Sequence, residues 1–332
     1  MTIPLVLCID VEPDAFFIDR RGGSPWTGTA RAFEAVELLR RELSEPGRPA
    51  VFTWTLRMDP QVELAYGRAD HAAGEFGAAL ERARAGGDEV GLHTHYYRWD
   101  ESLGDWIVDH GNPGWIEHCL RTSFGAFRAA FGRDCEVFRA GDRWHSDAAV
   151  ALVQALGARY DLTVEQGGQP AATGHPGKPY TGAIPDYSDV PARPYRPSTA
   201  DFRRAAATGG QDLWMIPLSG GTWVNPTWRR RWKREWVDRI DPWKRIRLLH
   251  RRIPYTLRPA AAPGLFREQF ETYCTERGFG YVALAVRTHC FARETERANV
   301  AENLHYLAAR LRGAGARFCT PAQAIESLEP VA

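Results

Sequence analysis

The spacing of apolar residues alternates along the chain between two patterns. Short apolar runs of strand length are followed by longer stretches in which apolar residues recur every three or four positions, as in an amphipathic helix. The short runs predict strands at Ile3–Ile9, Ala50–Leu56, Glu89–His93, Cys135–Arg139, Ala158–Leu162, Leu213–Leu218, Tyr281–Arg287 and Arg317–Cys319. Strands and helices are therefore expected to alternate along most of the sequence.

The segments between these strands are expected to be helices. Thr29 is predicted to cap the first helix, which continues to Glu45, because apolar residues follow it at helical spacing. Further helices are expected near residues 75–85, 115–131, 146–156, 265–277 and 299–312. A last helix is expected directly after Thr320, its predicted cap, with Pro321 at the first helical position.

About seven or eight strand–helix units in alternation favour a parallel (β/α) barrel over a sandwich or a helix bundle. We expect one α/β domain over residues 1–332, because neither an internal repeat nor a linker divides the sequence. Two stretches interrupt the alternation and are interpreted as insertions. Residues 167–210 are rich in Gly, Pro and Ala, and residues 223–259 are basic and rich in tryptophan.

Composition is that of an ordinary globular protein, with 44% hydrophobic residues, 25% charged residues and a formal net charge of +1. This near-neutral balance gives no reason to expect nucleic acid as a partner. The six cysteines are scattered without a Cys-x-x-Cys pair, which is typical of free thiols in a reducing compartment. The first apolar run lacks a basic leader and is too short for a signal peptide, so we expect a cytoplasmic protein.

Polar side chains recur where the predicted strands end. In a (β/α) barrel the carboxyl ends of the strands gather on one face, where catalytic residues sit. The residues at these positions are Asp10, Glu12, His93, His95, Arg139, Asp142, Asp161, Glu165 and His289. Because His93 and His95 are two positions apart, a strand would point both imidazoles to the same face, where they would form half of a metal site.

Four short motifs resemble those of the polysaccharide deacetylases of the NodB-homology group. They are Ile9–Glu12, Glu89–His95, Phe138–Gly141 and Arg287–His289. The resemblance covers the chain from residue 4 to about residue 325, and it implies a distorted (β/α) barrel that binds one divalent metal ion, most often Zn2+. It also implies roles for single residues, with Asp10 as general base, His93 as metal ligand, Arg139 orienting the base and His289 as general acid.

Two positions depart from the family pattern. The family has adjacent aspartates in its first motif, whereas the second carboxylate here is Glu12, two residues after Asp10. The family's second histidine follows the first by four positions, where this chain has Tyr97. We therefore expect the metal ligands to be Glu12, His93 and His95. Asp10, or neither carboxylate, is the alternative to Glu12, and a degenerate sugar-binding site is the alternative to catalysis.

The resemblance implies removal of an N-acetyl group from an amino-sugar unit of a glycan precursor, a nucleotide sugar or a sugar metabolite. A metal, a base and an acid would equally hydrolyse a non-sugar amide, which is the nearest alternative. A glycosidase is disfavoured, because Asp10 and Glu12 would point the same way from one strand rather than flank a bond. Side chains expected to contact the sugar are Tyr97, Trp99, Asp142, Trp144 and Trp223.

The second insertion combines positive charge with tryptophan. Residues 229–258 contain twelve Lys or Arg and three acids, a net charge of +9, and tryptophans at 228, 232, 236 and 243 follow helical spacing. One interpretation is a helix that packs its tryptophans on the barrel and leaves a solvated basic face. The other is that residues 228–258 contact an anionic membrane or a lipid-linked sugar, which would make the protein membrane-associated.

Overall fold

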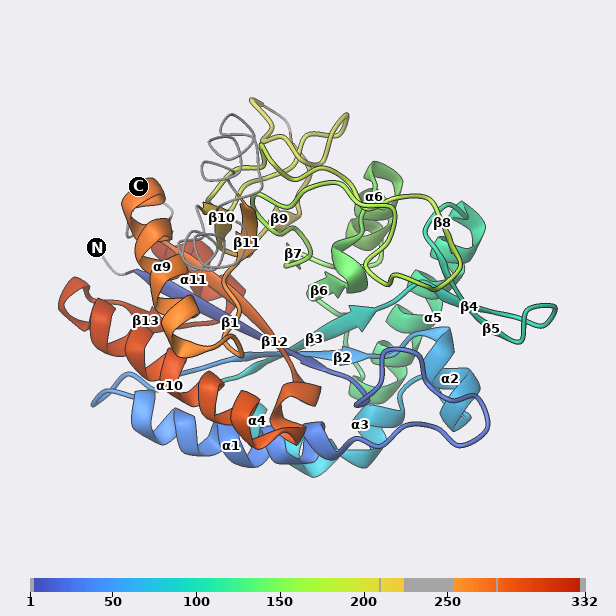
Figure 1. The fold of residues 1–332 in the computed structure, drawn as a ribbon, viewed down its shortest axis with the longest axis horizontal. Helices are drawn as coiled ribbons and strands as arrows, with labels where there is room; N and C mark the ends of the chain where they lie inside the picture. The colour runs from blue at the N-terminus through green and yellow to red at the C-terminus, as the bar shows by residue number, and fades with distance from the viewer. Residues whose placement is uncertain (1–2, 209, 224–252, 279, 329–332) are drawn as a thin grey trace, which may run out of the picture.

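A curled parallel sheet forms the centre of the molecule (Figure 1). The computed structural model describes residues 3–208, 210–223, 253–278 and 280–328. Within these ranges the largest sheet has eight strands, in the order β12-β1-β2-β3-β6-β7-β9 with β13 paired to β1, and all pairings are parallel. The strands are β1 Pro4–Val11, β2 Thr53–Arg57, β3 Glu89–Thr94, β6 Val137–Ala140, β7 Tyr160–Asp161, β9 Trp214–Met215, β12 Val282–Arg287 and β13 Arg317–Phe318.

The sheet bends into a half-barrel whose two edges approach each other. Just after β9, the backbone N–H of Ser219 donates to the carbonyl oxygen of Ala283 in β12 at 2.8 Å. The predicted fold class, a distorted (β/α) barrel, is therefore confirmed. All of the predicted strands are present with shifted ends, and those at Tyr160–Asp161 and Trp214–Met215 are much shorter than expected.

Helices follow most of the strands and cover the outer face of the sheet. They are α1 Thr27–Leu43, α2 Pro60–Tyr66, α3 His71–Glu75, α4 Gly77–Ala85, α5 Pro113–Phe131, α6 Asp147–Ala155, α9 Pro263–Arg277, α10 Glu294–Leu311 and α11 Pro321–Leu328. Figure 1 shows α1, α4 and α10 along one side of the sheet. The predicted cap of α11 is confirmed, because Thr320 Oγ1 accepts from the Gln323 N–H at 3.3 Å.

The predicted cap of the first helix is wrong. α1 begins at Thr27 and its N-cap position is Trp26, so Thr29 lies inside the first turn of the helix. The Thr29 hydroxyl instead lies 3.2 Å from the Glu12 carbonyl oxygen and 2.8 Å from Thr288 Oγ1. This contact joins the ends of β1 and β12, and both of these strand ends carry predicted site residues.

Alternation along β1 explains how two carboxylates come to point into the barrel. The odd-numbered residues of β1 join the core beneath the helices, whereas Val6 and Cys8 join a second apolar cluster inside the barrel. Side chains of a strand alternate between its two faces, so Asp10 and Glu12 continue the inner series. The odd-numbered residues of β1 therefore contribute to the hydrophobic core, and the even-numbered residues end in the two carboxylates of the site.

The same alternation fixes the inner residues of three other strands. In β3, β6 and β12 the apolar residues that join the outer core alternate with His93, Arg139 and Arg287. Deeper in the barrel the inner positions are apolar and include Val137 and Ala283. The inside of the barrel is therefore apolar towards the amino ends of the strands and charged at their carboxyl ends.

Two small sheets have no counterpart in the sequence-based prediction. β4 Tyr97–Asp100 and β5 Asp105–Asp109 form an antiparallel hairpin, and β8 Tyr180–Thr181 pairs with β5 in parallel. β10 Gly220–Trp223 pairs with β11 Ile253–Thr256 in antiparallel orientation. Trp223 and Ile253, the two described residues on either side of residues 224–252, lie opposite each other in this pair.

The structure describes nearly all of the first predicted insertion but only the ends of the second. Over residues 167–208 the two-residue strand β8 is the one regular element, in agreement with the loop-rich composition. The expected tryptophan-rich helix falls on residues 224–252, outside the described residues, so its membrane contact stays a prediction. In the part of the chain that is described, no helix has both the length and the apolarity needed to cross a membrane.

Candidate metal centre and active site

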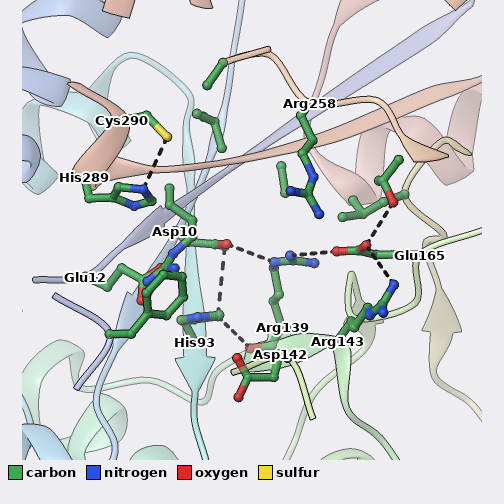
Figure 2. Close-up of a pocket in the computed structure, with 18 of the residues that line it drawn as sticks. Asp10, Glu12, His93, Arg139, Asp142, Arg143, Glu165, Arg258, His289 and Cys290 are labelled. Carbon is green, nitrogen blue, oxygen red and sulfur yellow. Dashed lines mark hydrogen bonds and ion pairs between the residues drawn. The ribbon is translucent and has the colours of Figure 1, made fainter. Parts of the chain in front are cut away.

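A cavity of about 710 Å³ lies at the carboxyl ends of the strands, and Figure 2 shows the polar side chains around it. This volume is within the usual range for small-molecule sites. Residues expected from the sequence that line it are Asp10, Glu12, His93, His95, Arg139, Asp142, Glu165 and His289. Asp161 lies elsewhere, because it is fully buried against His145 at 2.8 Å.

Glu12, His93 and His95 bring three ligand atoms together. One atom from each residue lies within 4.8 Å of the other two, and all three residues are buried. The Nε2 atoms of the two histidines are 3.0 Å apart, and Glu12 Oε2 is 3.5 Å from His95 Nε2. Two nitrogens on one tetrahedral zinc ion lie roughly 3.3 Å apart, so this spacing fits a single ion.

Neighbouring acceptors determine which nitrogen each imidazole presents. His93 Nδ1 lies 3.0 Å from the Arg139 carbonyl oxygen, which can only accept, so Nδ1 carries the proton and Nε2 keeps its lone pair. Asp142 Oδ1 is 3.7 Å from His95 Nδ1 and favours the same tautomer there. Glu12 Oε2 is buried and makes no hydrogen bond to any residue described. These facing lone pairs form a donor set that a divalent cation stabilises.

Burial and nearby charges keep two of the three candidate ligands, His93 and Glu12, in the forms that bind metal. Burial lowers the pKa of His93 to about 4, so its imidazole is neutral at neutral pH. Burial alone would raise the pKa of Glu12, but Arg287 and the two histidines outweigh it and hold this pKa well below its usual value. Arg287 Nε donates to Glu12 Oε1, which leaves Oε2 facing the histidines. For His95, burial and Arg57 act to lower the pKa, but Asp142 and Glu12 outweigh them and raise it, so this imidazole would release a proton when a metal ion binds.

Asp10 lies beside these ligands and is held by hydrogen-bond donors. Arg139 Nε donates to Oδ2 at 3.1 Å, and the Thr55 hydroxyl donates to Oδ1 at 2.9 Å. Burial acts to raise the pKa of Asp10, but the Arg139 guanidinium and His93 oppose it, and the net result is a lowered pKa. The result is an ionised, oriented carboxylate next to the candidate metal centre, as a general base requires.

His289 borders the cavity from η2 (Thr288–Ala292), directly after β12. Figure 2 shows His289 on one side of Asp10 and Glu165 on the other. Burial and the nearby Arg287 lower the pKa of His289, and its Nδ1 has no hydrogen-bond partner among the described residues. His289 also forms a second group of ligand-type atoms with Cys290 and Glu296, all within 4.8 Å of one another.

Asp142 connects the centre to the surrounding loops. Its Oδ1 accepts from the Tyr97 hydroxyl at 2.9 Å and from His175 Nε2 at 2.7 Å. Asp142 and Arg143, both in η1 (Gly141–Arg143), adopt left-handed backbone with φ of 54° and 52°. Such backbone costs on the order of 1–3 kcal/mol for a residue other than glycine. The strained turn directs the Asp142 carboxylate towards His95, 3.7 Å away.

Most of the residues expected to contact the sugar lie outside the cavity. Among Tyr97, Trp99, Asp142, Trp144 and Trp223, only Asp142 lines it. Tyr97 is buried and reaches Asp142 through its hydroxyl, and Trp99 lines a separate surface groove. Trp144 stacks on His110, and Trp223 is buried in β10. Stacking of the tryptophans on a sugar therefore stays a prediction.

Several residues that line the cavity were not predicted as site residues. Arg287 had a detectable signal, because it is in phase with Ala283 and Ala285 on the inner face of β12. His175 and Arg258 had none, because they lie in irregular segments where no periodicity indicates a direction.

Comparison with known proteins supports the fold. No family model matches the chain, and no curated protein sequence matches it. A solved structure from Mycobacterium smegmatis, provisionally assigned as a polysaccharide deacetylase, aligns with a TM-score of 0.52 and 13% identity over 98% of this chain and 90% of that one. A provisionally assigned glycoside hydrolase/deacetylase from Parabacteroides distasonis aligns with a TM-score of 0.53 and 15% identity over 96% and 69%. The chain has a NodB-like deacetylase fold.

Gly141 allows the His95 ring to occupy its position. A Cβ atom on Gly141 would lie 2.3 Å from His95 Nδ1, far inside any real contact. Gly141→Ala is therefore expected to displace the imidazole, weaken metal binding at the candidate centre and lower the free energy of unfolding by about 1–3 kcal/mol. Chelator competition and thermal unfolding would measure both effects. The matched control is Gly125→Ala, on an exposed part of α5 with open space around it, where metal affinity should not change.

His110 is expected to make stability depend on pH. Burial lowers its pKa to about 4 against the partial opposition of Asp142, whereas an unfolded histidine titrates near 6.5. The unfolded chain therefore binds a proton first, and stability is lost as pH falls from about 6.5 towards 4, by up to about 3 kcal/mol. His110→Phe preserves a ring against Trp144 and should reduce this dependence in urea unfolding across pH, leaving the part due to His93, whose pKa is also lowered to about 4. The exposed control His118→Gln should keep the wild-type slope.

Proposed function

We propose that the protein is a metal-dependent hydrolase that removes an N-acetyl group from an amino-sugar unit. One observation carries the proposal: the Glu12–His93–His95 ligand set and the Arg139-bound carboxylate of Asp10 share one cavity. The deacetylase-like fold supports it. We propose Zn2+ as the ion, since two imidazoles and one carboxylate are a typical zinc ligand set.

The residues around the ion divide the steps of amide hydrolysis between them. A divalent ion with open coordination positions lowers the pKa of a water molecule and polarises an acyl carbonyl. Asp10 is placed to accept the proton of the attacking water, and Arg139 keeps Asp10 ionised and oriented. His289 is assigned the proton transfer to the departing nitrogen, because an amine anion is a poor leaving group. His289 must therefore be protonated when that bond breaks, whereas burial and Arg287 lower its pKa and favour the neutral imidazole in the free protein.

Acetate release tests the proposal. Zinc-loaded protein would be incubated with N-acetylglucosamine, its oligomers and its phosphorylated derivatives, and with N-acetylated amino acids as non-sugar amides. Chelated protein is the matched blank. Release that is lost on chelation and restored by zinc is the expected result. Release of an acyl group only from non-sugar amides would favour the alternative hydrolase, and sugar binding without any release would favour a glycan-binding protein. Either outcome would contradict the proposal.

A further inference from the structure

Arg258 projects into the cavity from a turn whose adjacent residues are buried. Leu257 and Pro259 on either side are buried, whereas Arg258 itself is exposed. Figure 2 shows its side chain pointing into the cavity, which it helps to line. The turn therefore presents a single cationic side chain to whatever occupies the cavity.

Hydrogen bonds from the barrel and from α10 hold this turn in place. The Leu257 N–H donates to the Ser219 carbonyl oxygen at 2.9 Å. Asn303, fully buried in α10, donates through Nδ2 to the carbonyl oxygens of Pro259 at 2.7 Å and Ala261 at 2.8 Å. A backbone fixed in advance lowers the ordering cost of binding a ligand. Arg258 is therefore displayed from a rigid support.

Positive charge exceeds negative charge on this side of the cavity. Glu165 lies 3.8 Å from Arg139 Nη2 and 3.9 Å from Arg143 Nη1, so both ion pairs are long. Arg139 also binds Asp10, whereas Arg258 makes no ion pair with any residue in the described ranges. The guanidinium groups of Arg139, Arg143 and Arg258 therefore face two carboxylates, those of Asp10 and Glu165. Among the described residues, Arg258 pairs with neither.

We propose that Arg258, assisted by Arg143, binds an anionic group on the substrate, either a phosphate or a carboxylate. This inference rests on the proposed function and narrows its substrate class from neutral glycans to acidic amino sugars. The planar guanidinium matches two oxygens of a phosphate or carboxylate at once. A neutral sugar would leave the cation unpaired. The long contacts of Glu165 leave Arg143 free to turn towards the same anion.

Kinetics on matched substrates test this inference. The probes are neutral N-acetylglucosamine, its 1-phosphate, 6-phosphate and uridine diphosphate derivatives, and N-acetylmuramic acid as the carboxylate. For the wild type, kcat/KM for at least one anionic probe should exceed the neutral value by roughly 10- to 100-fold. This ratio should approach unity in Arg258→Gln and be partly restored in Arg258→Lys. It should persist in the control Arg121→Gln, on the exposed face of α5.

Each outcome decides for or against the subsite. Equal kcat/KM for neutral and anionic probes, or a preference that persists in Arg258→Gln, would overturn the inference and leave the proposed hydrolysis intact. If no probe releases acetate, calorimetric titration of the zinc-loaded variants with the same probes decides. Tighter binding of an anionic probe by the wild type than by Arg258→Gln would support the subsite and contradict hydrolysis, whereas equal binding would contradict both.

Discussion

Asp10→Asn is expected to lower kcat by roughly 10²- to 10⁴-fold, the usual contribution of a general base. The amide cannot accept the proton of the attacking water, although it fits the same space between Arg139 and Thr55. Because the assigned ligands remain, bound zinc should stay at the wild-type level. Acetate release and metal content of the same preparation would be measured together.

The matched control is Asp134→Asn, which removes an exposed carboxylate paired with Arg128 outside the cavity. Its kcat should equal that of the wild type. Loss of zinc from Asp10→Asn would show that Asp10 is the metal carboxylate in place of Glu12. Full activity in Asp10→Asn would exclude Asp10 as the base.

Glu12→Gln is expected to weaken both metal binding and the fold. Loss of a residue that merely orients a ligand costs about 10- to 100-fold in metal affinity, so loss of a ligand should cost more. The substitution also removes an anion from beside Arg57, which is fully buried, and Arg287. Breaking a buried pair in this way costs about 3–5 kcal/mol. Urea unfolding with and without zinc would separate the two effects.

The control for Glu12→Gln is Glu117→Gln, which breaks an exposed pair with Arg121 on α5. An exposed pair contributes about 0–1 kcal/mol, so this variant should unfold near the wild-type midpoint. If Glu12→Gln also unfolded there and retained its zinc, the assignment of Glu12 as a buried metal ligand would be contradicted.

Strand alternation made much of the site predictable from the sequence. Asp10 and Glu12 continue the inward-facing positions of β1, and His93 does so in β3. Because side chains alternate along a strand and the strand ends of a barrel converge, these residues are expected to lie together. The same reasoning would have placed Arg287 in the site. The prediction for Trp144 had no such support, because it relied on aromatic character alone, and the Trp144 ring is buried against His110.

Loops and turns set the limit of such predictions. The β4–β5 hairpin follows β3 after only two residues, a change of direction that no apolar period marks. His175 reaches Asp142 from a long loop whose position depends on contacts far along the chain. Thr29 looked like a helix cap because capping residues are short and polar, but its hydroxyl serves the junction of two strands. In each case the conformation depends on tertiary contacts, which the local sequence pattern does not indicate.

The departure from the family pattern at Tyr97 has a structural explanation. β3 ends at Thr94, so the chain has already turned when it reaches Tyr97, and the Tyr97 hydroxyl binds Asp142 rather than pointing at His93. His95 instead presents Nε2 at 3.0 Å from His93 Nε2. This geometry supports the proposal that His95, two positions after His93, is the second histidine ligand. It would replace the family's second histidine, which follows the first by four positions.

Metal content of purified, zinc-reconstituted protein tests the central claim most directly. Mass spectrometry of the wild type should find about one zinc ion per chain after dialysis, because the described residues offer one fully buried three-ligand set. His95→Ala should retain almost none, whereas the exposed control His118→Ala should bind as the wild type does. A wild type that retains no metal, or a His95→Ala variant that retains as much as the wild type, would contradict the account.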